Sequence, residues 1–383
     1  MAASERQVAL FASSKMLPAI PPEASTGYTQ VLPELVLAVN ERMRAHPSYA
    51  EWLGAHPPQL LSDNHRHAGQ FMDEIFATSN FDLLAASLPW VYNAYHMRGV
   101  PYDYFQHELS CWKEVVAGAL PSQQAKAINQ VYDWMLAQHE SVIALAAERA
   151  PLVKPVDPEL AEIFASVIDA ALAHDADRVL QLCRAKREEG MTLPALLQLL
   201  IYPLMRRVGC LWETNELSFS AEHEITAMIN RVLAALYFDQ PFPMPARGRA
   251  LVAASMNEYH EMGAWMVATC LELDGWDVDY LGVNLDQTAL LRRAGEFQPH
   301  LVALSVSMPF NLRAARQAIA ALREQLPGTT VMIGGQVFQL LPELAEGMGA
   351  DVCLHDCQAA MHWARSMSCG FDGDQSLNGR EDD

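Results

Sequence analysis

The stretch NEYHEMGAW (Asn257–Trp265) places His260 between two glutamates, after one apolar run and before an apolar segment with helical spacing. A neutral imidazole is a good ligand for a transition metal, and an acceptor at its second nitrogen orients the ring. A lone histidine in a loop is, however, more often an ordinary surface or packing residue. The surrounding pattern therefore has to decide between these two interpretations.

That pattern resembles a known signature. Residues 258–263, EYHEMG, resemble the cobalamin-binding signature Asp-x-His-x-x-Gly, which a serine motif and then a glycine pair follow. Between Gly263 and Ser305 lie 41 residues (264–304), and between Ser307 and Gly334 lie 26 (308–333). Both spacings match the family. The resemblance implies that cobalamin is bound by Glu258, His260, Gly263, Ser305, Ser307, Gly334 and Gly335.

The resemblance also implies a role for each of these residues. His260 would be the lower ligand of cobalt, in place of the cofactor's own dimethylbenzimidazole, and Glu258 would orient its ring. The family has Asp where this chain has Glu258, which keeps the carboxylate but lengthens its reach. The glycines would let the backbone approach the displaced nucleotide tail. Ser305 and Ser307 would supply hydroxyl groups to the tail.

A second motif lies upstream. Nine residues separate Trp212 from Glu222-His223, and Trp-x9-Glu-His resembles the signature of CarH-type light sensors, where it caps the upper face of adenosylcobalamin. The resemblance implies that Trp212 packs on the upper ligand and that Glu222 accepts hydrogen bonds from the adenosyl sugar. His223 would bind cobalt after photolysis. Ser220 is the expected N-cap of this helix. The alternative is a core tryptophan beside a solvated first turn.

The elements that position these residues follow from periodicity. The expected strands are 250–255, 277–283, 301–307, 330–335 and 350–355, and the helices between them are 261–274, 286–297, 312–325 and 338–347. Apolar strands alternating with helices predict a doubly wound, flavodoxin-like α/β domain over 248–365. Ligands bind beyond the carboxyl ends of such strands, where His260 is expected. Residues 157–237 lack strand signals and predict a bundle of about four helices.

The N-terminal region, 29–150, is also helical by periodicity, with a break at Gly99-Val-Pro101. One interpretation is an aromatic-rich core that serves dimerisation or docking. The other is a second chromophore pocket in a globin-like domain, because the two-domain plan resembles the photocobilins, which also bind biliverdin. A bilin needs cations and hydrogen-bonding groups, and haem is a further possibility. Candidate residues are Tyr95, His96, Arg98, Tyr102 and His107, with Arg66 and Cys111 as further candidates.

Composition restricts the functional class. The formal charge of −20 argues against binding to a phosphate backbone, and no winged-helix pattern like that of CarH-type proteins is present. The sequence contains no apolar run of membrane-spanning length and no convincing signal peptide, so we expect a cytoplasmic location. The segment 366–383 lacks apolar periodicity and is expected to be a disordered tail.

These observations predict a light sensor that uses adenosylcobalamin and is not an enzyme. Photolysis of the Co–C bond would change domain contacts or self-association, and the output would pass to an unidentified protein partner. Two alternatives remain open: a corrinoid carrier of a methyltransferase system, and a sensor or antirepressor that responds to cobalamin occupancy. A mutase is disfavoured because the chain has no room for the large barrel that such enzymes need.

Overall fold

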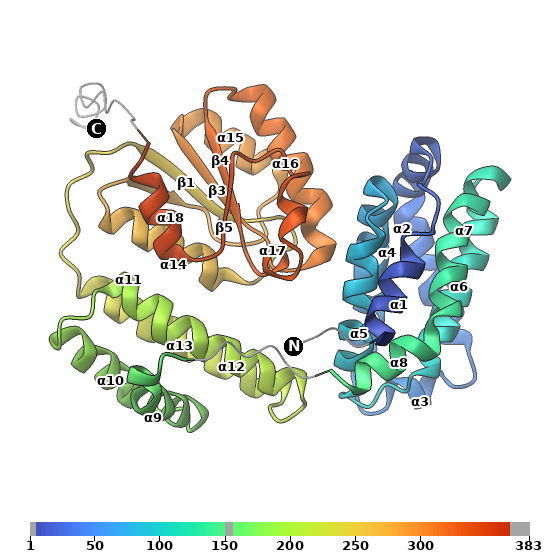
Figure 1. The fold of residues 1–383 in the computed structure, drawn as a ribbon, viewed down its shortest axis with the longest axis horizontal. Coiled ribbons are helices and arrows are strands. Elements are labelled where there is room, and N and C mark those ends of the chain that lie inside the picture. The colour runs from blue at the N-terminus through green and yellow to red at the C-terminus, as the bar shows by residue number, and fades with distance from the viewer. Residues whose placement is uncertain (1–4, 150–155, 368–383) are drawn as a thin grey trace, which may run out of the picture. The chain divides into compact units, whose positions relative to one another are not determined.

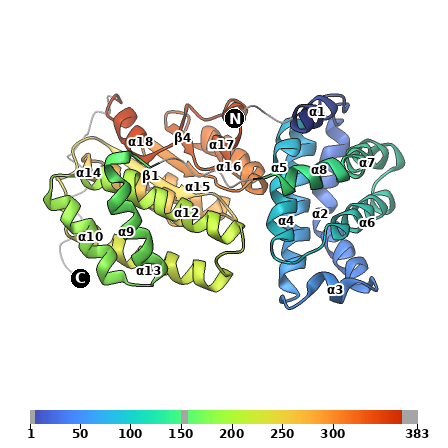
Figure 2. The ribbon, with the colours of Figure 1, turned by 60° about the horizontal axis from the view of Figure 1, so that its bottom comes forward.

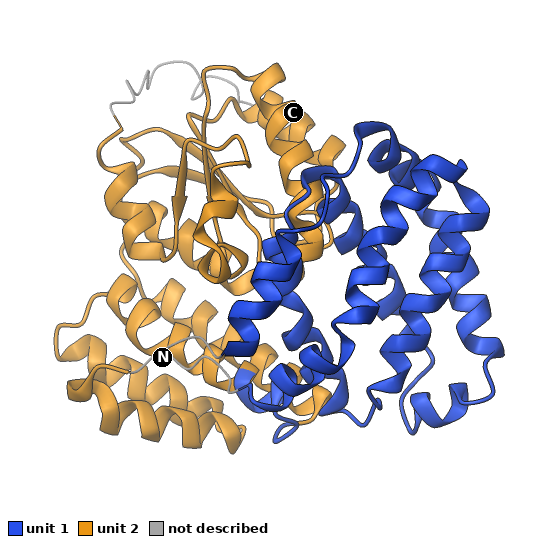
Figure 3. Ribbon diagram, turned by 45° about the vertical axis from the view of Figure 1, so that its right-hand side comes forward, with its two compact units in different colours: residues 1–152, 210–217 blue, residues 153–209, 218–383 orange. Residues whose placement is uncertain are grey.

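The computed structural model describes residues 5–149 and 156–367, and these divide into two compact units (Figure 3). The first unit contains the N-terminal residues through 152 together with Cys210–Leu217. The second contains 153–209 and everything from Ser218 onward. No helix within the described ranges is both long enough and apolar enough to cross a membrane.

The described N-terminal part of the first unit is entirely helical. Its helices are α1 (Glu5–Ser14), α2 (Pro22–Ala45), α3 (Tyr49–Leu53), α4 (Gln59–Thr78), α5 (Phe81–His96), α6 (Asp103–Ala119), α7 (Ser122–Ala137) and α8 (His139–Ala147). The central helix is α2, which packs against α4, α6 and α7 through buried Tyr28, Val39 and Met43. Because α1 packs against α5 and α8, this unit includes residues before the predicted boundary at 29.

The second unit begins with the predicted helical bundle. Its elements are η1 (Pro158–Leu160), α9 (Ala161–Leu172), α10 (Ala176–Glu188), α11 (Leu193–Leu196), the π-helical turn η2 (Leu197–Ile201), α12 (Tyr202–Glu213) and α13 (Phe219–Phe238). Figure 2 shows α9, α10 and α13 side by side, and their mutual contacts agree. Since α11, η2 and α12 follow one another without a break, the bundle has four helical rods, as the apolar spacing predicts.

The rest of the second unit is a parallel sheet with helices on both faces (Figure 1). Its elements are β1 (Arg249–Ala254), α14 (Glu261–Leu273), β2 (Asp277–Tyr280), α15 (Gln287–Phe297), β3 (Leu301–Ser305), η3 (Pro309–Asn311), α16 (Leu312–Gln325), β4 (Thr330–Gly334), α17 (Val337–Leu340), η4 (Pro342–Ala345), β5 (Val352–Leu354) and α18 (Cys357–Ala364). The strand order β2-β1-β3-β4-β5 confirms the flavodoxin-like prediction.

Alternate residues of the strands separate the two faces of the sheet. Ala250, Val252 and Ala303 pack with α14 and α18, whereas Ala253 and Leu304 face α15 and α16. From β1 the chain first moves outward to the edge strand β2, and it then returns to the other side of β1 and continues through β3 and β4 to β5. The loop after β1 and the loop after β3 therefore open at the edge where ligands bind in this class of fold.

The prediction of one helix is wrong, and the predicted tail lies mainly outside the residues that the structure describes. A single helix was expected over 338–347, but α17 ends at Leu340 and a 3-10 turn begins at Pro342. Pro342 has no N–H to donate to the preceding turn, which favours a helix end there, although α2 and α5 continue through Pro33 and Pro89. For the expected disordered tail, residues 368–383 lie outside the described residues.

Candidate functional site

His260 lies at the N-cap of α14, directly after the loop that follows β1. Its Nδ1 donates a hydrogen bond to Oε1 of Glu258, so the longer glutamate side chain does reach the ring. The Glu258 side chain is fully buried, whereas 60% of the His260 side chain is exposed. A proton on Nδ1 leaves the lone pair on Nε2, which is the tautomer that a metal ligand needs.

The second oxygen of Glu258 is held by three donors. Oε2 accepts hydrogen bonds from the main-chain N–H groups of Ser307 (2.8 Å) and Met308 (3.0 Å) and from Nδ2 of Asn311 (3.1 Å). Burial raises the pKa of Glu258, but its bonds to His260, Ser307 and Asn311 outweigh burial and lower this pKa to about 2. The carboxylate is therefore ionised and fixed in place.

The charge state of His260 depends on the same pair. Burial lowers the pKa of His260, but the hydrogen bond and the charge of Glu258 outweigh burial and raise it, with a further contribution from the charge of Glu222. Glu222 lies on α13, in the helical bundle. The bundle and the loop after β1 therefore act on the same imidazole within one unit.

Three asparagines that sequence reasoning missed shape this loop. Asn257 has a left-handed backbone (φ 60°), and its N–H donates to Oδ1 of Asn284 at 3.1 Å. Asn311, which is fully buried, donates from Nδ2 to the Asn257 carbonyl at 3.3 Å as well as to Glu258. The sequence signal was weak, because Asn311 lies 53 residues from Glu258 and outside the motif spacing.

The glycine pair has a packing role that is visible in the fold. A Cβ on Gly334 would overlap the Leu354 carbonyl oxygen, and one on Gly335, where φ is +117°, would overlap the Val306 backbone. A Cβ on Gly263 would lie in ordinary contact, 3.7 Å from the Ser305 hydroxyl. Gly334 and Gly335 are thus required by strand packing alone. Gly263 and Ser305 lie close together, at the ends of their own elements.

The tip of α13 carries the second motif. Glu222 and His223 contact each other, with Oε2 and Nδ1 2.6 Å apart, and 61% of the His223 side chain is exposed. Glu222 also accepts a hydrogen bond from the Thr226 hydroxyl at 2.9 Å. The predicted N-cap is wrong: the N-cap of α13 is two residues earlier, at Ser218, whose hydroxyl accepts from the Ala221 N–H, and the Ser220 hydroxyl instead bonds to that of Ser218.

Trp212 is grouped with the first unit, although most of its helix belongs to the second. There the guanidinium of Arg98 lies over the indole, with Cζ 3.6 Å from the ring centroid. Arg98, which was expected to bind a bilin propionate, is therefore engaged with a motif residue. Arg66, the other candidate cation, pairs with Asp63 at 2.9 Å.

The remaining bilin candidates fall into two groups. His96 stacks on Tyr102 with ring centroids 3.9 Å apart, and Tyr95 packs edge-on against Phe105, beside the turn between α5 and α6. His107 instead packs against His46 and Trp52 with its ring tilted to both. The predicted break at Gly99-Val-Pro101 is correct, since α5 ends at His96 and α6 begins at Asp103. Cys111 is a half-buried free thiol on α6.

The first unit also contains a buried polar network that the sequence did not reveal. Asn64 donates to the Tyr104 hydroxyl (2.9 Å) and to Glu108 (3.0 Å), Tyr104 lies 2.9 Å from Nε2 of His65, and Nδ1 of His65 lies 2.6 Å from Asn40. Burial lowers the pKa of His65 to about 4 and raises the pKa of Glu108 to about 7. Both side chains therefore favour the neutral form.

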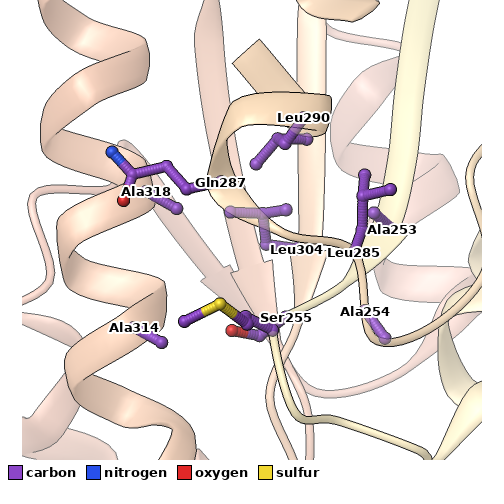
Figure 4. A pocket seen from close by; sticks show the side chains of 10 residues that line it. Ala253, Ala254, Ser255, Leu285, Gln287, Leu290, Leu304, Ala314 and Ala318 are labelled. Carbon is purple, nitrogen blue, oxygen red and sulfur yellow. The ribbon is translucent and has the colours of Figure 1, made fainter. Parts of the chain in front are cut away.

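A small apolar pocket lies on the other face of the sheet (Figure 4). It is lined by ten residues: Ala253, Ala254, Ser255, Met256, Leu285, Gln287, Leu290, Leu304, Ala314 and Ala318. None of the predicted cobalamin-binding residues is among them. The pocket is therefore distinct from the face that carries α14 and Gly263.

Comparison with known proteins identifies the chemistry of the second unit. Models of the B12-binding domain match residues 248–362 and residues 163–237. Together these ranges cover the sheet, its helices and most of the bundle. The prediction of a cobalamin cofactor is therefore confirmed, and the second unit is a cobalamin-binding module.

The chain is similar to two kinds of curated protein. The HTH-type transcriptional repressors CarA and CarH of Myxococcus xanthus are 29% and 27% identical over 50% and 52% of this chain, which covers 64% and 65% of their own lengths. The chain thus spans just under two thirds of each repressor. Dimethylamine corrinoid protein 2 of Methanosarcina acetivorans is 24% identical over 55% of this chain and 97% of its own length.

Proposed function

We propose that this chain, whose second unit is a cobalamin-binding module, is a cytoplasmic, non-enzymatic light sensor that uses adenosylcobalamin. The observation that carries the proposal is the electrostatic link between the Trp-x9-Glu-His motif and the lower ligand. The charge of Glu222 contributes to the raised pKa of His260, so this motif residue and the proposed lower ligand interact within the second unit. A protein that only carries a corrinoid has no need of such a cap.

The lower side of this region suits a cobalt ligand. Glu258 occupies Nδ1 of His260, Nε2 makes no hydrogen bond with any of the described residues, and the ring is largely exposed. In this proposal Nε2 of His260 binds cobalt and the ionised Glu258 raises the basicity of the ring. In this proposal Gly263 and Ser305, which lie close together, border the nucleotide tail, and Ser307 acts through its main-chain N–H on Glu258.

We propose that the motif residues Trp212, Glu222 and His223 serve the upper side of the cofactor. Adenosylcobalamin supplies a Co–C bond that light breaks. In this proposal Trp212 packs against the upper ligand and excludes water, and Glu222 accepts hydrogen bonds from the sugar hydroxyls. His223, which contacts Glu222 here, would be the residue that holds cobalt in the photoproduct. The exposed position of His223 leaves it free to make this change of partner.

The consequence of illumination is a change in contacts. A ligand change acts only through interactions that differ between two states, and in this proposal those interactions change at the tip of α13. We propose that the bundle shifts against the sheet and alters self-association or the binding of a protein partner. The alternative in which the protein binds nucleic acid directly is disfavoured by the net charge of −20.

A second pigment is a weaker part of the proposal. The aromatic group at the α5–α6 turn, Tyr95, His96 and Tyr102, suits stacking and hydrogen bonding to biliverdin in a globin-like domain. His107 lies apart from them, in a separate aromatic group with His46 and Trp52. An absorption band in the red after reconstitution with biliverdin supports the bilin, and its absence contradicts this part alone.

The test is His223→Ala, with His174→Ala as the matched control on another exposed histidine of the bundle. Both variants are reconstituted with adenosylcobalamin, and absorption spectra are recorded before and after green light. We expect both to bind in the dark and only His223→Ala to lose the stable photoproduct. A normal photoproduct in that variant removes His223 from the mechanism, and a light-insensitive wild type contradicts the proposal.

The corrinoid carrier remains the second candidate, supported by similarity to the dimethylamine corrinoid protein over nearly its whole length. A carrier needs an upper face open to partner enzymes, so it predicts a preference for methylcobalamin and methyl transfer in the dark. An occupancy sensor or antirepressor predicts that cobalamin binding alone, without light, changes oligomeric state. Size-exclusion chromatography in the dark, with and without cofactor, distinguishes the occupancy sensor from the light sensor.

A further inference from the structure

The end of α12 is held by two arginines of the N-terminal region, Arg98 just after α5 and Arg149 just after α8. Arg98 lies over the Trp212 indole with Cζ 3.6 Å from the ring centroid, and its Nη2 donates a long hydrogen bond (3.5 Å) to the Trp212 carbonyl. The next residue, Glu213, pairs with Nε of Arg149 at 3.1 Å, with side chains only 13% and 21% exposed. All four residues belong to the first unit (Figure 3).

Arg98 is itself fixed in position. Its Nη1 donates to the Ala94 carbonyl in the last turn of α5, and its own carbonyl accepts a hydrogen bond of 2.7 Å from Nε2 of His56. The guanidinium therefore cannot swing freely. It presents a planar cation to the indole from a rigid helix end, and partial removal from water strengthens this kind of contact.

The indole has no other polar anchor. No acceptor for the Nε1–H of Trp212 is found in the part of the chain that the structure describes. The orientation of Trp212 thus depends on what covers its faces and on the helix that carries it. Among the described residues, Arg98 is the only cation found over the indole ring.

The same helix leads into the cobalamin-binding module. Residues 202–209 of α12 belong to the second unit and Cys210–Glu213 to the first, with no break in the helix. Five residues after Glu213 the chain reaches Ser218, the N-cap of α13, which carries Glu222 and His223. A displacement of the α12 end is therefore transmitted along the backbone in both directions.

We propose that Arg98 is a positioning residue which holds the Trp212 indole for the upper ligand of cobalamin, and that Arg98 and Arg149 together couple the N-terminal helical unit to the state of that ligand. This inference rests on the proposed function, in which Trp212 contacts the upper ligand. It assigns to the N-terminal unit a regulatory role that needs no second chromophore.

The physical argument is one of linkage. When Arg98 covers one face of the indole, the ring is held in the orientation that offers its other face to an adenosyl group. Any change in the N-terminal unit that moves Arg98 then changes the affinity for adenosylcobalamin. By reciprocity, loss of the adenosyl group changes the stability of the Arg98–Trp212 contact by the same factor.

The experiment measures dark dissociation constants of the full-length protein for adenosylcobalamin and hydroxocobalamin, which differ in the upper ligand. In Arg98→Ala we expect the preference for adenosylcobalamin over hydroxocobalamin to fall by about fivefold. Arg98→Lys keeps the charge but not the planar stacking, and should recover only part of the preference. Glu213→Gln breaks the second contact and should act in the same direction.

Arg42→Ala is the matched control, because Arg42 forms an exposed ion pair with Glu114 in the same unit. It should leave the preference unchanged. Equal weakening of both cobalamins in Arg98→Ala, or an unchanged preference in a variant that melts like the wild type, overturns the proposal. If the wild type itself shows no preference between the two cobalamins, the assignment of Trp212 to the upper face fails, and the proposed function fails with it.

Discussion

Glu258 joins the two halves of the lower site: one carboxylate oxygen accepts the Nδ1 proton of His260, and the other is bound by donors from the loop after β3. The histidine of one loop is thus oriented by the backbone of the neighbouring loop, across the switch point of the sheet. An ionised, fully buried carboxylate in this position fixes both the tautomer and the direction of the ring.

Glu258→Gln should abolish ligation by His260. A glutamine that places its oxygen toward the loop donors must place its NH₂ group toward Nδ1, which forces the proton onto Nε2 and blocks that atom as a ligand. We expect cobalamin affinity to fall by about 10- to 100-fold, measured by spectroscopic titration.

Glu261→Gln is the control for this prediction. Glu261 flanks His260 on the other side but contacts the Tyr280 hydroxyl instead of the imidazole. The variant should bind cobalamin nearly as the wild type does. Equal losses in both variants would mean that the local charge, and not the orientation of the ring, determines the affinity.

Asn311 should matter through Glu258. Asn311→Ala removes one of three donors to the buried oxygen and should weaken cobalamin binding by about tenfold or less, because two main-chain donors remain. Asn311→Asp places a second carboxylate against the first and should be clearly worse than alanine. If the two variants bind equally well in the same titration, the Asn311–Glu258 contact does not position His260.

Gly335→Ala should destabilise the sheet domain. The residue has φ +117°, and a methyl group there would overlap the Val306 backbone, so both the conformation and the space oppose it. We expect a loss of about 3 kcal/mol in the free energy of unfolding. Gly328→Ala, where the space around a Cβ is open, is the control. Thermal unfolding without cofactor compares them, and similar melting temperatures would contradict this account.

Because Glu108 is buried, the N-terminal helices should be less stable above pH 7 than below pH 4.5. Its folded pKa, about 7, exceeds its ordinary value of 4.5. The stability it contributes is therefore present below about pH 4.5 and is lost as pH rises through about 7. Glu108→Gln removes this loss, so the variant should gain about 3 kcal/mol relative to the wild type between pH 4.5 and pH 8.

This pH effect is measured as the difference between variant and wild type in thermal unfolding at the two pH values. The difference isolates Glu108 from His65, whose depressed pKa acts in the opposite direction, with stability lost as pH falls from about 6.5 toward 4. A difference that does not change with pH would mean that Glu108 is ionised in the folded protein throughout this range.

The sequence by itself determined most of the second unit. Strands of a parallel sheet covered on both faces are almost continuously apolar. Short apolar runs therefore located β1 to β5 to within a few residues. The motif spacing then located His260, Ser305 and the glycine pair at strand ends. These signals are local or depend on fixed distances along the chain, so a single sequence contains them.

Tertiary structure alone decided which side chains meet. Asn311 on Glu258, Arg98 on Trp212 and the His65–Tyr104–Asn64–Glu108 network join residues from different elements, and no local pattern marks such pairs. Residue type identified Arg98 as a cation that could bind an anion, but only the structure shows that it lies over the Trp212 indole. The physical reason is that folding brings distant segments together, and the choice of contacts is made by packing, not by the spacing of residues along the chain.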